Sequence, residues 1–203
     1  MAKETSTLSV PHIILGLLKE PTSGYSIKQD FDNVFKNFWA AEQSQIYRTL
    51  KSLEAQGLVE SEEAPSKKGP KRRLYLRTAA GRAALLEWLG SAAEIGDSRI
   101  PYLARLFFLG QLEDLKASEV FLEEIRDHYA GLLEALQALD ASWRADCTDF
   151  PNFDCDEEFH AYLVLAHGMA KTESVLHWAE TAIEWIHARR TGSSSKEEKG
   201  RAS

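Results

Sequence analysis

Cysteine is scarce in this sequence, with two residues among 203. Cys147 and Cys155 could pair with each other, but one pair does not make a disulfide framework, and reduced thiols in the cytoplasm are the simpler interpretation. Long apolar runs are also lacking, because none approaches the roughly 20 residues that span a membrane. We therefore expect a globular, cytoplasmic protein that has no contact with a membrane.

Signatures of catalysis and of metal binding are lacking as well. The sequence contains no Ser-His-Asp arrangement, glycine-rich phosphate loop, His-Glu-x-x-His motif or Cys-x-x-Cys motif. His160, His167 and His177 fall on one predicted helix, where occasional histidines are common, so a metal site is a minority interpretation. Adjacent carboxylates such as Glu62 and Glu63 are interpreted as solvated. The sequence gives no support for an enzyme and predicts neither a cofactor nor a metal.

The balance of charge differs between the two halves of the chain. The net charge of −7 by itself argues against nucleic acid as a partner. However, residues 1–90 hold 13 Lys and Arg against 10 Asp and Glu, so the negative charge belongs to the remainder. Five cations fall within the nine residues 65–73. A weakly basic domain with its cations clustered in this way can still bind phosphates.

The stretch over residues 42–57 predicts a helix with one buried face. Ile46, Leu50 and Leu53 recur at i, i+4 and i+7, which is one apolar stripe of a helix. Gly57 is placed to end the helix, because glycine accepts a left-handed backbone without steric cost. Polar and cationic residues occupy the other faces. The candidates for contact with a ligand on this helix are Gln43, Ser44, Tyr47, Arg48 and Lys51.

Two short strands and a basic turn follow the helix. Residues 58–60 begin an extended segment, and residues 74–77 alternate in the manner of a strand. Alternation leaves open which side chains of the second strand face the core, since a one-residue shift exchanges the two faces. A helix with a cationic outer face followed by a basic hairpin is typical of a winged helix-turn-helix DNA reader. The cations of the turn are Lys67, Lys68, Lys71, Arg72 and Arg73.

Helices are predicted on both sides of this segment. We expect one over residues 9–19 and a second over residues 24–35, capped by Thr22 or Ser23. Thr78 is expected to cap a fourth helix over residues 79–93. Ala83, Leu86 and Leu89 share one face of this helix, which we expect to be its apolar face, with Trp88 beside it.

The C-terminal half is predicted to be helical throughout, apart from an irregular loop at residues 147–156. Its helices are expected over residues 103–109, 117–141 and 157–189. The polar composition of the last residues predicts disorder. The domains that we expect are a winged helix-turn-helix over residues 1–95, a helical dimerisation domain over residues 96–190 and a disordered tail over residues 191–203.

Several motifs occur in a fixed order between residues 8 and 90. They are a hydrophobic first helix, Ser23-Gly24-Tyr25, Ile46-Tyr47 with Leu50 and Leu53, Gly57-Leu58-Val59, the basic turn ahead of Tyr75, and Thr78 with Gly81. This set resembles the PadR family of bacterial transcriptional regulators. The helical pattern that follows, with the motif ARLFFLGQL, is similar to the longer PadR-type regulators, whose C-terminal domain dimerises.

The resemblance implies a homodimer that represses transcription by binding a palindromic operator in double-stranded DNA. The outer face of the helix would enter the major groove, and the cations of the wing would neutralise phosphates. For Tyr47, contact with DNA and packing against the second helix are favoured equally. The residues that we expect to contact DNA are Gln43, Ser44, Tyr47, Arg48, Lys51, Lys67, Lys68, Lys71 and Arg72.

Tryptophan is the residue that bears on effector binding. Packing in a core or an interface is favoured for each tryptophan taken singly. Some PadR-like regulators use aromatic side chains to sense aromatic ligands, so a small aromatic effector is a possible partner. Nothing in the sequence selects which residue would contact it. The five candidates are Trp39, Trp88, Trp143, Trp178 and Trp185.

The expected fold class is mostly α, with a two-stranded β wing in an N-terminal winged helix and an all-α C-terminal domain. Two rival functions stay open beside that of a regulator. One is a winged-helix adaptor that contacts proteins and responds to no effector. The other is an enzyme with a helical active-site domain, which would need a convergent polar pocket. Salt-dependent binding to promoter DNA would separate a regulator from an adaptor.

Overall fold

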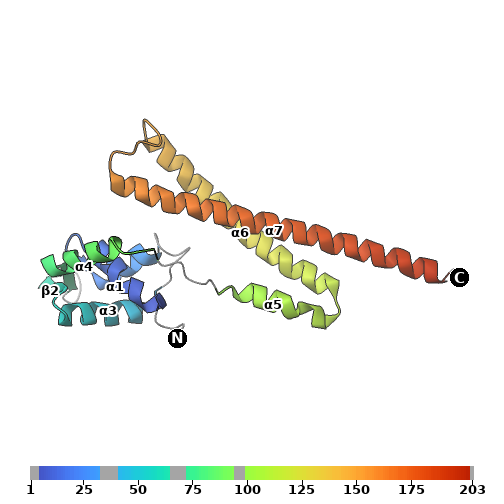
Figure 1. Cartoon of the computed structure of the whole chain (residues 1–203), viewed down its shortest axis with the longest axis horizontal. Coiled ribbons are helices and arrows are strands. Elements are labelled where there is room, and N and C mark those ends of the chain that lie inside the picture. The colour runs from blue at the N-terminus through green and yellow to red at the C-terminus, as the bar shows by residue number, and fades with distance from the viewer. Residues whose placement is uncertain (1–4, 33–40, 65–71, 94–98, 202–203) are drawn as a thin grey trace. The chain divides into compact units, whose positions relative to one another are not determined.

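The computed structural model describes residues 5–32, 41–64, 72–93 and 99–201 (Figure 1). The chain divides into two units, residues 1–98 and 99–203, whereas the sequence placed the joint after residue 95. Lys67, Lys68, Lys71 and Trp39 lie outside the described residues, as does the expected end of the second helix. Over the described ranges, no helix combines the length and the apolar character needed to cross a membrane.

Over the residues that the structure describes, four α-helices build the N-terminal unit, and their ends follow the signals in the sequence. Ser23 Oγ accepts a hydrogen bond from the amide of Ser26 at 3.1 Å, and Thr78 Oγ1 accepts one from the amide of Gly81 at 3.1 Å. Both expected caps are therefore confirmed. Gly57 follows the third helix with φ of 70°, the left-handed conformation predicted for it. The helices are α1 (Thr5–Leu17), α2 (Gly24–Asp30), α3 (Gln43–Ala55) and α4 (Ala79–Leu89).

A small antiparallel sheet joins these helices. The wing strands β2 (Val59–Ala64) and β3 (Arg72–Arg77) pair as expected, and a third strand, β1 (Thr22–Ser23), pairs with β3 to give the order β1-β3-β2. The sequence did not predict β1, because two polar residues ahead of a helix carry no strand periodicity. Tyr75 is 7% exposed and packs in the core. The face of β3 that points to the core is therefore the one that carries Tyr75. Tyr75 faces inward, and its neighbours at every second position, Arg73 and Arg77, lie on the same face of the strand.

The core of this unit lies between α1, α2, α3 and the sheet. Ile46 and Leu50 of α3 are fully buried and Leu53 is 2% exposed, which confirms the predicted apolar stripe. They pack with residues from α1 and α2, among them Ile14 and Ile27. Burial of such side chains is the main source of stability for a unit of this size. The exposed face of α3 is therefore supported by the core behind it.

The buried face of α4 is different from the one that we predicted. Ala83, Leu86 and Leu89 are all exposed, Leu86 to 54% and Leu89 to 62%. Ala84 and Leu85 pack against the core in their place. The prediction of the α4 face was wrong because this helix is apolar around most of its circumference, so more than one stripe fits the helical period.

A close backbone approach selects the face that α4 buries. A Cβ atom at Gly81 would lie 2.0 Å from the carbonyl oxygen of Leu58, so only glycine lets the helix come this near to the chain ahead of β2. Trp88 lies two turns further along the same face and stacks on His12 of α1, with ring centroids 4.9 Å apart and planes inclined by 3°. The contact at Gly81 fixes the rotation of the helix.

The C-terminal unit consists of three helices, α5 (Pro101–Leu109), α6 (Leu115–Asp146) and α7 (Asp156–Arg201). Helices α6 and α7 form a long hairpin, with α5 and a short 3₁₀ turn (Gly110–Leu112) beside α6 (Figure 1). Two separate apolar clusters hold the unit together. One includes Phe121, Leu122 and Ile183, and the other lies around Leu136 and Tyr162.

The last helix continues further than expected. We predicted a helix over residues 157–189 and a disordered tail over residues 191–203, but α7 runs from Asp156 to Arg201. The expectation of disorder was based on polar composition alone. The run KEEK at residues 196–199 consists of good helix formers, whereas the run TGSSS at residues 191–195 does not, so helix propensity alone does not explain the extension.

Candidate nucleic-acid interface

The outer face of α3 displays the candidate residues that the sequence assigned to it. Gln43, Ser44, Tyr47, Arg48 and Lys51 are all exposed, while the opposite stripe is buried. Arg48 Nε donates to the backbone carbonyl of Ser44 at 3.3 Å, which leaves the rest of its guanidinium toward solvent. Arginine and lysine on such a face can donate to guanine or to phosphate. The face is polar, cationic and backed by a rigid core.

Tyr47 is in contact with the second helix. A Cβ atom at Gly24 would lie 2.6 Å from Cε1 of Tyr47 and 3.1 Å from its hydroxyl oxygen, so the ring covers the first residue of α2. The side chain nevertheless stays 42% exposed. The ring therefore packs against α2, as one of the two interpretations of Tyr47 expected, and part of the side chain is left accessible.

The described strands of the wing carry two adjacent arginines that differ in their surroundings. Arg72 lies at the start of β3 opposite Ala64 and is exposed, with no side-chain partner among the described residues. Arg73 lies on the face that carries Tyr75 and Val59. The alternation of a strand thus separates two cations that the sequence places side by side.

Arg73 is held by a carboxylate of α3. Its Nη2 donates to both carboxylate oxygens of Glu54, at 2.7 and 2.9 Å, and its Nε donates to Ser61 Oγ at 2.7 Å. Ser61 in turn donates to Glu54 Oε1 at 2.5 Å. The hydrogen bonds from Ser61 and Arg73 lower the pKa of Glu54, which stabilises its charged form. We counted Arg73 among the cations of the basic turn, but its guanidinium is engaged within the protein.

A second arginine of β3 is also engaged internally. Arg77 Nη1 donates to the carbonyl oxygen of Leu15 at 2.9 Å, across 62 residues of sequence. The signal for both contacts is the strand alternation, because Arg73 and Arg77 flank the inward Tyr75 at every second position. Once Tyr75 is known to face inward, both arginines are expected on the face of β3 that carries Tyr75, where Arg77 is partly buried and Arg73 is exposed.

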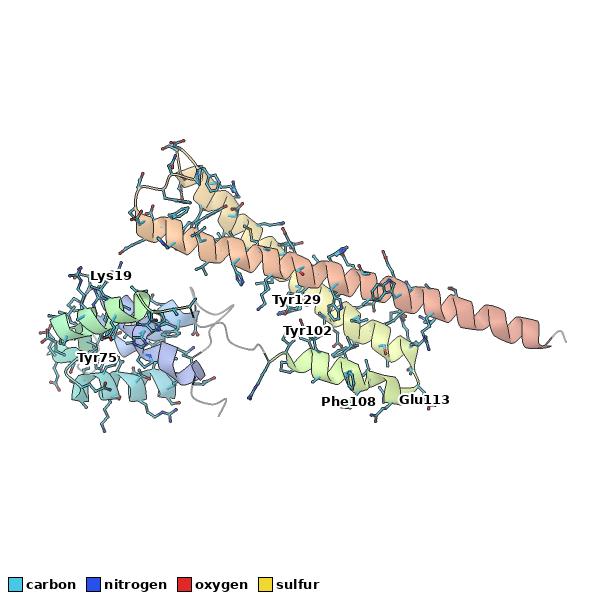
Figure 2. All side chains as sticks on the ribbon, viewed as in Figure 1. Lys19, Tyr75, Tyr102, Phe108, Glu113 and Tyr129 are labelled. Atoms are coloured by element: carbon cyan, nitrogen blue, oxygen red, sulfur yellow. The ribbon has the colours of Figure 1, made fainter. Side chains whose placement is uncertain are left out.

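The C-terminal unit holds three of the tryptophans, and two of them lie in aromatic clusters. Trp178 lies 6.3 Å from Tyr102, and Tyr102 meets Tyr129 edge to face, also at 6.3 Å (Figure 2). Trp143 packs with Tyr162 at 6.2 Å. Trp185, by contrast, is 68% exposed. These positions agree with a packing role for Trp178 and Trp143 and leave Trp185 on the surface.

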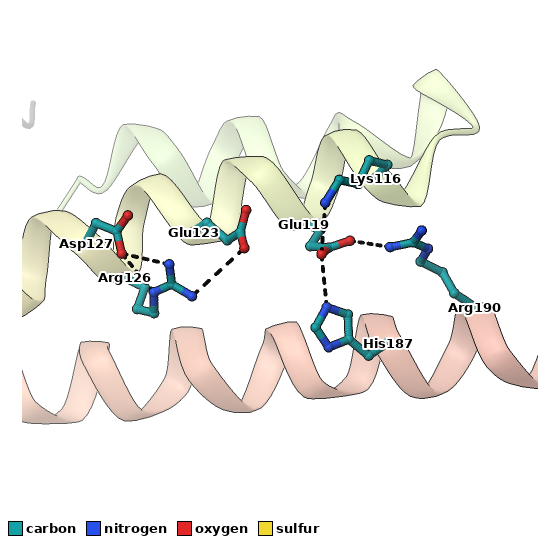
Figure 3. A network of polar contacts seen from close by, with 7 residues as sticks. All are labelled: Lys116, Glu119, Glu123, Arg126, Asp127, His187 and Arg190. Carbon is teal, nitrogen blue, oxygen red and sulfur yellow. Dashed lines mark hydrogen bonds and ion pairs between the residues drawn. The ribbon is translucent and has the colours of Figure 1, made fainter.

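A buried carboxylate connects the beginning of α6 with the far part of α7. The side chain of Glu119 is 8% exposed and contacts His187 Nε2 and Lys116 Nζ, both at 3.0 Å, as well as Arg190 (Figure 3). Hydrogen bonds from His187 and Lys116 lower the pKa of Glu119 to about 2. Within the described ranges, no group of three or more His, Cys, Asp or Glu side chains is arranged to hold a metal ion.

Comparison with known families assigns both units. The pattern of the transcriptional regulator PadR-like family matches residues 14–87. The pattern described as virulence activator alpha C-term matches residues 98–187. The two matches together cover most of the chain and meet near the boundary between the two units.

The chain is also similar to individual regulators. It is 27% identical over 180 residues to the negative transcriptional regulator PadR of Bacillus subtilis, covering 86% of this chain and 96% of that protein. The crystal structure of Bacillus subtilis PadR in complex with operator DNA has the same fold, with a TM-score of 0.75, 24% identity and coverage of 87% and 98% of the two chains. The structure of that protein with p-coumaric acid gives a TM-score of 0.69 at 25% identity, covering 88% and 98%.

Proposed function

Because the chain belongs to the PadR-like family of transcriptional regulators, we propose that it acts as a homodimeric repressor on a palindromic operator and responds to a small aromatic effector. It is a DNA-binding regulator rather than an enzyme. The observation that carries the proposal is the outer face of α3, where Arg48 and Lys51 are exposed beside the wing. The relative of known operator, Bacillus subtilis PadR, is a negative regulator.

In this proposal α3 enters the major groove of the operator. Arg48 and Lys51 donate to base edges or to phosphates, and the polar side chains of Gln43 and Ser44 at the start of the helix contact the DNA beside them. The wing contacts the neighbouring backbone and fixes position without reading sequence. The residues assigned to DNA are Gln43, Ser44, Tyr47, Arg48, Lys51, Lys67, Lys68, Lys71 and Arg72.

The apolar surface of the C-terminal unit supports a homodimer. Phe107 and Phe108 of α5 are 81% and 60% exposed, and Leu112 beyond them is 62% exposed. Exposed apolar side chains at this density mark an interaction site. A two-fold dimer would cover them and present one α3 to each half of a palindrome.

An effector is proposed on narrower grounds. Bacillus subtilis PadR has been solved in complex with p-coumaric acid, an aromatic acid. The present chain offers aromatic clusters around Trp178 and Trp143. Titration of the chain with p-coumaric acid and with other aromatic acids, followed by tryptophan fluorescence and by release of DNA, tests this part of the proposal.

The main test measures how salt affects DNA binding. An operator is first selected from a random duplex library by the wild-type chain. Changing Lys67, Lys68, Lys71 and Arg72 together to Ala should then weaken binding to all duplexes, and each lost phosphate contact should flatten the log–log salt slope by about 0.9. Unchanged affinity and slope in this variant would exclude the wing as a phosphate clamp.

Two controls sharpen this test. Arg82→Ala removes an exposed arginine of α4 that we do not assign to DNA, so its salt slope should equal that of the wild type. A wild-type chain that shows no salt-dependent binding to any duplex would favour the protein-interaction adaptor, because only neutralisation of phosphates produces a steep slope.

A further inference from the structure

The contact between Arg73, Glu54 and Ser61 joins three elements of the N-terminal unit at one point. Glu54 belongs to α3, Ser61 to β2 and Arg73 to β3. Arg73 Nη2 contacts both carboxylate oxygens of Glu54, Arg73 Nε donates to Ser61 and Ser61 donates to Glu54, with all four donor–acceptor distances between 2.5 and 2.9 Å. Two nitrogens of one planar guanidinium are held at once, which fixes its orientation as well as its distance. We call this contact the α3–wing clamp.

The α3–wing clamp lies where the wing leaves the body of the unit. Arg73 pairs with Glu63 and Arg72 pairs with Ala64, and the basic turn follows directly beyond that last pair. Glu54 is on α3 three residues after Lys51, about one turn of helix away. The clamp thus connects the end of α3 that follows its exposed cations to the base of the hairpin that carries the wing cations.

Arg73 has a different chemical setting from the cations that we assign to DNA. Its charge is compensated by Glu54 at hydrogen-bond distance, whereas Arg72, Arg48 and Lys51 have no carboxylate partner among the described residues. The Nη2 and Nε atoms of Arg73 are already engaged by Glu54 and Ser61, so these two donors hold the protein rather than the DNA.

We propose that the α3–wing clamp is a positioning device, which sets the angle between the recognition helix and the wing so that both reach one operator at once. Residues that do not contact DNA then determine operator affinity. The inference rests on the proposed function, because it concerns the same surface. Both contact surfaces are needed in register for the operator, while random DNA is bound mainly through phosphates and tolerates a change of angle.

Two substitutions distinguish this role from contact with phosphate. Glu54→Gln removes a negative charge beside the DNA-binding face, so electrostatics alone would tighten DNA binding. Arg73→Lys keeps the positive charge but loses the planar fork, so a simple phosphate contact would tolerate it. The positioning role instead predicts weaker binding to the operator for both substitutions.

The experiment uses the full chain and two duplexes of equal length, a library-selected operator and a random sequence. Glu54→Gln and Arg73→Lys should each weaken operator binding about tenfold, while binding to the random duplex changes by less than about twofold. The double variant should be no weaker than either single variant, since both remove one shared contact. The melting temperature should change little, because solvent-exposed ion pairs contribute little to stability.

Matched controls are available in the same unit. Glu62→Gln removes an exposed carboxylate from β2 that has no side-chain partner among the described residues, and Arg82→Lys makes the arginine change on α4. Neither should weaken operator binding. These controls separate the geometry of the clamp from a general effect of charge.

Three results would overturn the inference while the proposed function stands. They are unaltered or tighter operator binding by Glu54→Gln, equal losses on operator and random DNA, and additive losses in the double variant. A wild-type chain that selects no operator at all would overturn the proposed function, and this inference with it. The outcome for the wild type therefore shows which of the two has failed.

Discussion

The two units of this protein cover their apolar side chains to different degrees. In the N-terminal unit, Ile14, Leu18 and Ile46 are completely buried. In the C-terminal unit most core residues keep a small exposed fraction, such as 8% for Phe121 and 7% for Leu136. Short helices around a small sheet close their own core, whereas a hairpin of two long helices leaves apolar stripes that its neighbours do not reach. If the C-terminal unit forms the proposed dimer, the two units should respond differently when they are separated or when their cores are truncated.

The largest expected effect comes from separating the two units. A fragment of residues 1–98 should fold, because its core, over the described residues, is formed between Val10 and Leu85. It should sediment as a monomer and bind the operator about 10²–10⁴-fold more weakly than the full chain, since two linked half-site readers raise the effective concentration.

The full chain provides the control for this prediction. It should sediment as a dimer at micromolar concentration, and the fragment and the full chain should bind a duplex with a single half-site with similar affinity. A monomeric full chain, or a fragment that binds the complete operator as tightly as the full chain, would contradict the contrast between the units.

The sequence predicted the part of the fold that depends on periodicity. The stripe of α3 and the caps at Ser23 and Thr78 follow from residue type and spacing. The buried face of α4 does not, because the helix is apolar around most of its circumference and the choice is made by the approach of Gly81 to the Leu58 carbonyl. That approach is a tertiary contact, which no local pattern contains.

The core comparison is tested by truncating one buried leucine in each unit. Leu50→Ala should lower the free energy of unfolding of the N-terminal unit by about 2–5 kcal/mol, because the side chain is fully buried and leaves a cavity. Leu136→Ala should cost its own unit less, since its surroundings are already partly open. Hydrogen exchange read by mass spectrometry reports each unit separately. Equal losses at the two sites would show that the cores do not differ in this way.

The candidate site was predictable to the extent that it lies on α3. Polar residues opposite a strong apolar stripe must be exposed, and Arg48 and Lys51 are. The sequence could not show that Arg73 binds a carboxylate while Arg72 does not, because the alternation did not say which face of β3 points to the core. The partner of Arg73 is Glu54, 19 residues earlier, and only the fold brings the two together.

The next effect in size is a loss of operator affinity when Arg48 of the N-terminal unit is truncated. If Arg48 reads a base edge, Arg48→Ala should cost about 1–3 kcal/mol on the operator and relax the preference at one position in each half-site. Its only intramolecular hydrogen bond in the described structure is to the Ser44 carbonyl, so thermal stability should be nearly unchanged. Competition between operator and random duplexes measures the change. Equal weakening on both would assign Arg48 to phosphate.

The smallest expected effect belongs to the C-terminal unit and depends on pH. The pKa of Glu119 lies at about 2, below its ordinary value of 4.5, because His187 and Lys116 donate hydrogen bonds to the carboxylate. A depressed carboxyl pKa stabilises the native state above the unfolded-state pKa, and this contribution disappears as pH falls from about 4.5 towards 2. Glu119→Gln should therefore lower the urea midpoint of this unit at pH 7 and match the wild type near pH 2.

Glu124→Gln is the matched control. Glu124 lies at an exposed position of the same helix and has no side-chain partner among the described residues, so this variant should follow the wild type at every pH. A constant difference between the wild type and Glu119→Gln across this range would show that the contact of Glu119 with α7 does not depend on its charge.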